Sequence, residues 1–124
     1  MKITAFETIP IQGRSMILRM FTDQGIIGYG EPMNYEHWRV VSQAVDDMAE
    51  YLVGKDPLQI EDHWQTMYRS SYSRSMPVLV GALSGIEMAM WDVFGSHWHA
   101  GVEITWRFSV SACSGVYRHW RQHT

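Results

Sequence analysis

The segment from Val78 to Phe94 constrains the fold more than any other part of this chain. Its large apolar residues cover nearly the whole circumference of a helix: Val80, Leu83, Ile86, Met88, Met90, Trp91 and Val93. A helix that is apolar on every side is buried on every side. Pro77 suits its first turn, where the missing N–H would have no partner, and Gly95 is a natural C-cap. The sequence therefore predicts a buried core helix.

Three strands precede that helix in the sequence. Loosely alternating apolar and polar residues predict the first strand over residues 2–10. A run rich in Met, Ile, Leu and Phe predicts the second over residues 16–22, and the third follows over residues 26–30. In the first strand Ile3, Ala5 and Ile9 share one parity, with Phe6 as an exception. Asp23-Gln24-Gly25 separates the second strand from the third, and Gly25 supplies the positive φ that a tight hairpin needs. The pattern predicts a small antiparallel sheet.

Two more helices lie between the strands and the core helix. Apolar residues recur at three- and four-residue spacing over residues 36–52 and again over residues 58–70. Gly54, followed by Pro57, gives the stop signal between them. Three strands and two helices can cover about two faces of the third helix. Residues 1–95 are therefore expected to form an α+β unit that docks on something larger.

The composition excludes several classes of function. The 124 residues are too few for a (β/α)₈ barrel, which needs roughly 250. With 10 Lys and Arg against 13 Asp and Glu, the chain has no basic field for nucleic acid. One cysteine, Cys113, and an N-terminus unlike a signal peptide predict a cytoplasmic protein. Residues 77–91 carry Glu87 and are shorter than the ~20 residues that span a bilayer, so we expect no membrane segment.

The character of the chain changes after Gly95. Residues 96–124 hold four of the six histidines, three of the six tryptophans and the only cysteine, without a clear amphipathic period. We predict an irregular tail, in which the alternation over residues 102–108 permits one short strand.

Two histidine pairs in this tail have spacings that metal sites use. His119 and His123 are four residues apart, and His97 and His99 form another close pair. Neither pair has a carboxylate or thiol ligand nearby at a spacing that would complete a metal site. We therefore expect no metal site in this chain, and a tail that binds Zn²⁺ or Ni²⁺ is the alternative.

Three stretches of residues 1–95 together resemble a known family. Residues 22–31, Thr-Asp-Gln-Gly-Ile-Ile-Gly-Tyr-Gly-Glu, resemble the hairpin of the capping domain in the mandelate racemase and muconate lactonising branch of the enolase superfamily. Gly54-Lys55-Asp56-Pro57, continuing through Trp64 to Arg69, is similar to its second helix. Residues 84–92, with Ser-Gly-Ile-Glu at the start and Trp-Asp at the end, are similar to its third. Within that branch the similarity points to sugar-acid dehydratases of the galactonate dehydratase type.

The resemblance implies an N-terminal α+β cap laid over a modified TIM barrel that this chain does not contain. In such enzymes the barrel holds Mg²⁺ with carboxylates and supplies a Lys or His base that takes the proton α to the substrate carboxylate. This chain is therefore expected to carry no catalytic residue and no cofactor. Mg²⁺ and a small sugar acid are expected only in the intact parent.

The resemblance also implies that two loops of this chain close on the substrate. Arg14 follows the first strand, and Tyr72 and Arg74 lie between the second and third helices. An arginine in such a loop can fork onto a carboxylate or hydroxyls. A solvated loop arginine is the alternative for each.

The sequence departs from the family pattern at Ser96, where the family has Lys, a short linker, Pro and a Leu-Gly-Gly that enters the barrel. Read one base later, permitted codons for residues 96–107 can spell Ala-Ile-Gly-Met-Pro-Val-Trp-Lys-Leu-Leu-Gly-Gly. We therefore hypothesise that residues 1–95 are the cap. Residues 96–124 would then be an aberrant, frame-shifted tail in place of the start of the barrel.

Two functions follow from these observations. The first is a truncated sugar-acid dehydratase that keeps only the substrate-closing cap and is inactive alone. The second is a stand-alone interaction module that forms a homo-oligomer or binds a partner through the exposed face of the third helix. Glu87 and Asp92 on that helix are five residues apart and do not share a face, so we expect them to make capping or linker contacts with the missing barrel rather than to work as an acid–base pair.

Overall fold

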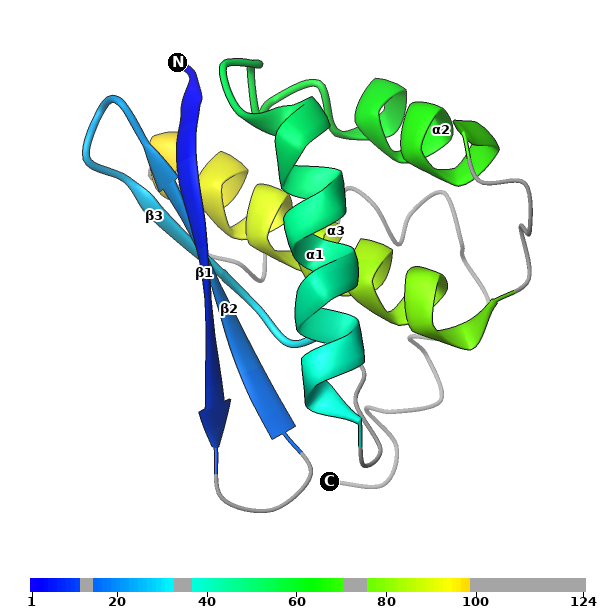
Figure 1. The fold of residues 1–124 in the computed structure, drawn as a ribbon. Coiled ribbons are helices and arrows are strands. Elements are labelled where there is room, and N and C mark those ends of the chain that lie inside the picture. Colours follow the sequence, from blue (N-terminus) through cyan, green and yellow to red (C-terminus); the bar gives the residue numbers. More distant parts are fainter. Residues whose placement is uncertain (12–14, 33–36, 71–75, 99–124) are drawn as a thin grey trace, which may run out of the picture.

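The computed structural model describes residues 1–11, 15–32, 37–70 and 76–98. Its elements are, in chain order, β1 (Ile3–Ile11), β2 (Ser15–Thr22), β3 (Ile27–Gly30), α1 (Trp38–Leu52), α2 (Ile60–Ser70) and α3 (Pro77–His97). The strands form one antiparallel sheet in the order β1-β2-β3, and the helices lie on one side of it (Figure 1). The predicted α+β fold is confirmed. The tail strand predicted over residues 102–108 lies outside the described residues.

The central strand, β2, separates the two faces of the sheet. Met16, Leu18 and Met20 are fully buried at alternate positions, and the residues between them are only half-buried. Because side chains alternate across a strand, the three buried residues share the face that meets the helices. The hydrophobic core therefore lies between this inner face and the three helices.

The first strand differs from the predicted pattern. The β1–β2 register shifts between Ile3 and Ala5, and an extra residue at such a bulge moves the following side chains to the opposite faces. Ile3 is buried and Phe6 packs against the core. Ile9, predicted to share the face of Ile3, is 37% exposed, and Ala5 is exposed. The prediction that Ile3, Ala5 and Ile9 share one face of the sheet is therefore wrong.

The predicted hairpin between β2 and β3 is confirmed. Gly25 has φ +77°, which an L side chain rarely adopts. Thr22 closes the turn with its hydroxyl: Oγ1 accepts from the N–H of Ile26 at 3.1 Å and donates to the carbonyl oxygen of Ile26 at 2.8 Å. These bonds fix the register of the two strands.

The junction between α1 and α2 is held by polar contacts. Asp56 Oδ1 accepts from the N–H of Leu58 at 3.0 Å, and this side-chain turn delays the start of α2 to Ile60, two residues later than predicted. His63 is buried, and its Nε2 lies 2.7 Å from the carbonyl oxygen of Asp56. A carbonyl can only accept, so Nε2 carries the proton. His63 therefore ties α2 to the loop that precedes it.

Helix α3 extends beyond its predicted end. Gly95, predicted as the C-cap, is buried inside the helix, which runs to His97 with Trp98 as its C-cap. A helix-interior glycine costs about 1 kcal/mol relative to alanine. Aromatic contacts in the last turns offset that cost: Phe94 lies 5.7 Å from Trp91 and 6.4 Å from Trp98 between ring centroids.

The backbones of β3 and α3 approach each other closely. A Cβ atom on Gly28 would overlap the carbonyl oxygen of Ala89, and one on Gly30 would overlap the carbonyl oxygen of Gly85. A Cβ atom on Gly85 would come 2.5 Å from Cγ of Pro32. Only glycine leaves room for backbone contact at these three positions.

Helix α3 is the core helix, as predicted, although one stripe of it remains exposed. Nine of its 21 residues are buried, and it contacts β2, β3, α1 and α2. Among the described residues it is the one helix long and apolar enough to cross a membrane, and half of the apolar window is buried inside the fold. Val80 and Met88 are 44% and 41% exposed.

The glycine contacts predict a large loss of stability on substitution. Gly30→Ala places a methyl group against the rigid carbonyl oxygen of Gly85, so we expect a loss of about 3 kcal/mol in the free energy of unfolding. Gly25→Asn is the matched control, because Asn tolerates the positive φ and nothing lies within 4 Å of the new Cβ. Urea denaturation measures both, and equal midpoints for the two variants would contradict this account.

Candidate functional site

The three residues predicted to face a substrate lie outside the described residues. Arg14 falls between Ile11 and Ser15, which are paired across β1 and β2 at one end of the sheet. Tyr72 and Arg74 fall in the sequence between Ser70, where α2 ends, and Pro77, where α3 begins. The structure therefore places the ends of both predicted loops, and the roles of the three side chains stay predictions.

The sheet end next to Arg14 is held together by a side-chain hydrogen bond. Ser15 begins β2 and donates from Oγ to Oε1 of Glu31 at 2.8 Å. Glu31 follows β3 directly. The bond therefore joins the start of β2 to the end of β3, where the chain leaves the sheet toward α1.

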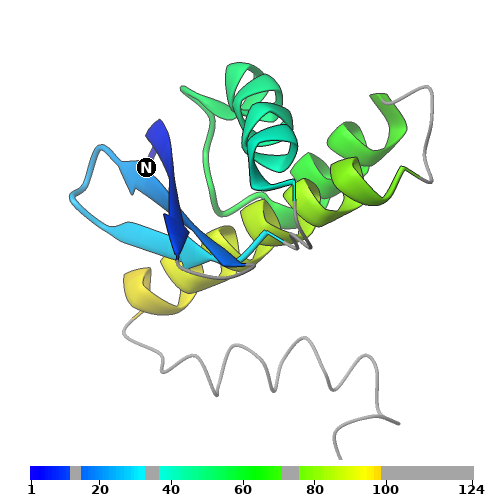
Figure 2. The ribbon, with the colours of Figure 1, turned by 60° about the horizontal axis from the view of Figure 1, so that its bottom comes forward.

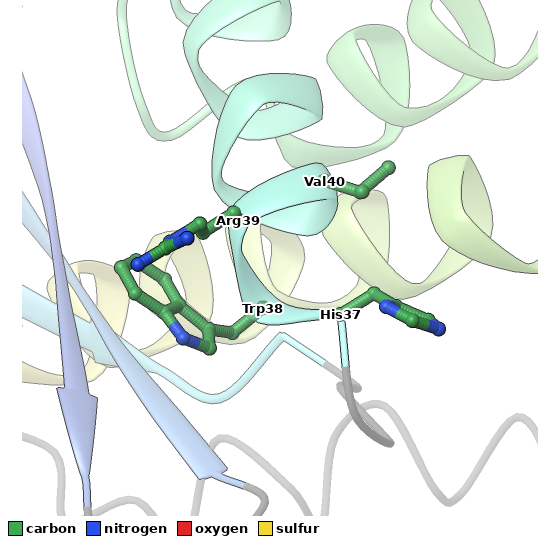
Figure 3. Close-up of a pocket in the computed structure, with 4 residues that line it drawn as sticks. All are labelled: His37, Trp38, Arg39 and Val40. Carbon is green, nitrogen blue, oxygen red and sulfur yellow. The ribbon is translucent and has the colours of Figure 1, made fainter.

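Helix α1 begins at this same end of the molecule (Figure 1). A pocket there is lined by His37, Trp38, Arg39 and Val40. The guanidinium carbon of Arg39 lies 5.4 Å from the centre of the Trp38 ring. Figure 3 shows these two side chains together, while His37 and Val40 point to the opposite side of the start of α1. Trp38 also packs against the core. The indole thus supports the arginine on a fixed surface.

Arg39 carries the positive charge among the four described residues that line this pocket. The first turn of α1 carries no acidic residue, and His37 makes no side-chain cap hydrogen bond. The dipole of α1 therefore adds positive potential to the charge of Arg39. The periodicity and motifs of the sequence did not predict this pocket. Its signal was the run of His37, Trp38 and Arg39 at the start of the predicted helix.

The two carboxylates of α3 make contacts within this domain, and the predicted capping or linker contacts with a barrel stay a prediction. Asp92 Oδ2 accepts from the backbone N–H of Tyr29 at 2.9 Å. Glu87 Oε1 accepts from Nε1 of Trp91 at 3.4 Å. Tyr29 lies in β3, an edge strand, so Asp92 satisfies a donor that would otherwise face an incoming strand.

The described residues offer no ready metal centre. Across residues 1–11, 15–32, 37–70 and 76–98, no three His, Cys, Asp or Glu side chains are grouped so that they could hold an ion. His99, His119 and His123, which the sequence offered as members of metal pairs, lie outside this part of the chain. The described residues therefore do not fit a Mg²⁺ site.

Comparison with known proteins decides the family. Residues 2–103 match the family described as mandelate racemase / muconate lactonizing enzyme, N-terminal domain. The chain belongs to this family. It is an enolase-superfamily N-terminal domain related to galactonate dehydratases. The predicted resemblance is confirmed.

Curated relatives of this domain are full enzymes. It is 43% identical over 102 residues to the D-galactonate dehydratase of Cronobacter sakazakii, with 82% of this chain and 27% of the relative covered. It is 44% identical over 95 residues to that of Ralstonia pickettii, with 77% and 25% covered. The chain thus spans about a quarter of the length of these relatives.

A solved structure with the same fold comes from Pantoea ananatis. This enolase, solved with bound D-gluconate and Mg, aligns with a TM-score of 0.74 and 37% sequence identity. The alignment covers 77% of this chain and 24% of that one. The sequence match over residues 2–103 and the fold of the described residues both place this chain at the N-terminal part of this superfamily.

Proposed function

We propose that this domain is the cap of a galactonate-type sugar-acid dehydratase and that it closes over a substrate whose chemistry the rest of the enzyme performs. The observation that carries the proposal is the identity of 43–44% to two D-galactonate dehydratases over 95–102 residues. A sugar acid carries a carboxylate and several hydroxyl groups, which a guanidinium binds well. We place this cap in the cytoplasm.

The geometry of one end of the domain supports this role. The segment with Arg14 leaves the sheet there, and the pocket with Arg39 lies at the same end. Arg39 is supported by Trp38 and by the positive end of α1. An anionic substrate would therefore meet cationic groups from two parts of the cap.

The chemistry of the proposed reaction needs groups beyond these. The Pantoea ananatis enolase was solved with Mg, and we propose that Mg²⁺ binds to the barrel of the intact enzyme, where it would stabilise the charge that develops on the substrate. We propose that residues 1–124 alone are inactive. Loss of every catalytic group removes at least about 8 kcal/mol of transition-state stabilisation.

A chimera tests the cap function directly. Residues 1–95 of this chain replace the matching segment of the Ralstonia pickettii D-galactonate dehydratase, and dehydration of D-galactonate is assayed with Mg²⁺. We expect the chimera to be active, and the 124-residue chain alone to show no more turnover than buffer. Turnover by the chain alone, or a folded chimera without activity, would refute the proposal.

The substrate-facing residues are tested in the same chimera. Arg14→Ala and Arg74→Ala each remove a charged hydrogen-bond donor, so we expect kcat/KM to fall roughly 10- to 100-fold, with a smaller loss for Tyr72→Phe. Arg69→Ala is the matched control, since Arg69 is an exposed arginine in the last turn of α2. If all three variants behave like the control, these side chains are solvated loop residues.

We also propose that residues 96–124 arise from a shift of reading frame after Gly95. The departure from the family pattern at Ser96, and the barrel linker that the shifted frame can spell, support this. The gene provides the test. We expect the shifted frame downstream of the Gly95 codon to continue into the family linker and a barrel strand, and a shifted frame that reads otherwise overturns the idea.

The second function, an interaction module, draws support from one observation. Val80 and Met88 of α3 are exposed apolar residues on the core helix. A partner that packed on this stripe would remove both side chains from water. In this alternative the domain binds through α3, and Met88→Glu would abolish the interaction.

A further inference from the structure

The peptide bond between Asp56 and Pro57, in the segment that joins α1 to α2, has a polar setting of its own. The carbonyl oxygen of Asp56 accepts from Nε2 of His63 at 2.7 Å and from the backbone N–H of Gln59 at 3.4 Å. Two N–H groups thus converge on one peptide oxygen. This is the arrangement of an oxyanion hole, which stabilises the negative charge that develops on a carbonyl oxygen under attack.

The His63 donor is held in place from both sides of its ring. Only 3% of its surface is exposed, and the ring of Tyr51 meets it edge-on with 5.9 Å between the centroids. The hydroxyl oxygen of Tyr51 lies 3.4 Å from Nδ1, the ring nitrogen that accepts because Nε2 carries the proton. Contacts with α1 therefore fix Nε2 against the carbonyl oxygen of Asp56.

The carboxylate of Asp56 is held beside the same peptide group. Its Oδ1 accepts from the N–H of Leu58 at 3.0 Å, and this bond turns the side chain toward the peptide group that follows it. A carboxylate can act as a nucleophile, and attack of this one on its own main-chain carbonyl carbon closes a cyclic anhydride. Because the side chain is already ordered, much of the entropy cost of that closure is removed.

Proline on the other side of the bond favours cleavage. The nitrogen of Pro57 belongs to a tertiary amide and carries no hydrogen, and it takes up a proton more readily than an ordinary peptide nitrogen does. Pro57 is fully buried, whereas Asp56 is only half-buried, so water reaches the bond from the side of Asp56. The nucleophile, the oxyanion donors and the leaving group thus meet at one peptide bond.

The chain on the N-terminal side of this bond is anchored to the sheet. The N–H of Ile3 donates to the carbonyl oxygen of Lys55 at 2.9 Å, and the N–H of Gly54 donates to the carbonyl oxygen of Ile3 at 2.8 Å. Figure 2 shows this segment beside the start of β1. These bonds restrict the motion of the segment, so Asp56 stays against the donors that α2 supplies.

We propose that the bond between Asp56 and Pro57 is a self-cleavage site, at which the Asp56 carboxylate attacks its own main-chain carbonyl carbon while His63 and Gln59 stabilise the oxyanion. A bond forms from a carboxylate oxygen to that carbon, and the carbonyl electron pair moves onto the carbonyl oxygen. The C–N bond to Pro57 then breaks as the carbonyl re-forms, and the proline nitrogen keeps the electron pair and takes a proton from the solvent.

Water completes the reaction. One water molecule adds to the cyclic anhydride and opens it to two carboxylates on Asp56, and the protons that are released pass to the solvent and to the amine of Pro57. The net change is hydrolysis of one peptide bond. The products are residues 1–56, with the sheet and α1, and residues 57–124, with α2 and α3. Because α3 contacts β2, β3 and α1, we expect the two pieces to stay associated.

This inference does not rest on the proposed cap function, since it uses none of the residues predicted to face a substrate. Incubation of the full 124-residue chain in mildly acidic buffer, followed by intact-mass spectrometry, tests it. Acid supplies the proton that the proline nitrogen takes. We expect fragments 1–56 and 57–124 to form about 10-fold faster or more in the folded chain than in the same buffer with urea, which dismantles the oxyanion hole. Circular dichroism confirms the two states. A chain that stays intact, or one that is cleaved no faster when folded, overturns the proposal.

A matched pair of variants tests the nucleophile. Asp56→Asn keeps an oxygen that accepts from the N–H of Leu58 but removes the carboxylate, so we expect the two fragments to be absent. Asp23→Asn is the control, because the Oδ1 of Asp23 also accepts from a backbone N–H, that of Lys2 at 2.9 Å. We expect this control to be cleaved like the unmodified chain. Cleavage of folded Asp56→Asn at the unmodified rate, as a contaminating protease would give, contradicts the proposed step.

Substitution of His63 tests the oxyanion hole. His63→Leu removes the donor to the Asp56 carbonyl, so we expect cleavage of the folded variant to be about 10-fold slower or more. His63→Gln retains a side-chain N–H and should lose less. A folded His63→Leu chain that is cleaved at the unmodified rate refutes the role of His63. If that variant does not fold, the urea comparison and Asp56→Asn still decide the proposal.

Discussion

The contact between the backbones of β3 and α3 determines how the whole domain is arranged. Gly28 and Gly30 leave no side chain between the strand and the helix, so the helix lies directly against the edge of the sheet. Asp92 then accepts a hydrogen bond from Tyr29 and fixes α3 along that edge. With α3 held there, its remaining sides are available to α1 and α2. Strand β3 is short, yet it positions the core helix for every other element.

The same contact explains the composition of α3. Gly85 and Ala89 face β3, where larger residues would clash, while Ile86, Met90 and Val93 fill the core. A helix with small residues on one side and large ones on the others is apolar all round without being buried all round. The exposed stripe with Val80 and Met88 is what the domain's own elements do not cover.

The domain separates its surfaces. The pocket at the start of α1, the Ser15–Glu31 bond and the segment that holds Arg14 gather at one end of the sheet. The face of the sheet that carries the Glu7–Arg19 pair points away from the helices (Figure 2).

The sequence by itself determined the elements of this protein and, through its motifs, the family. Strands, hairpin and helices follow from local periodicity and turn chemistry, which depend on neighbours within a few residues. Only the tertiary structure decided the features that depend on contacts between segments far apart in the sequence. The bulge after Ile3 reversed the faces of Phe6 and Ile9, and aromatic contacts carried α3 past Gly95. The partner of Asp92 lies 63 residues away, and the Trp38–Arg39 pocket needed α1 to begin where it does. Such features depend on contacts between distant segments, and their energies outweigh the local preferences from which a sequence is interpreted.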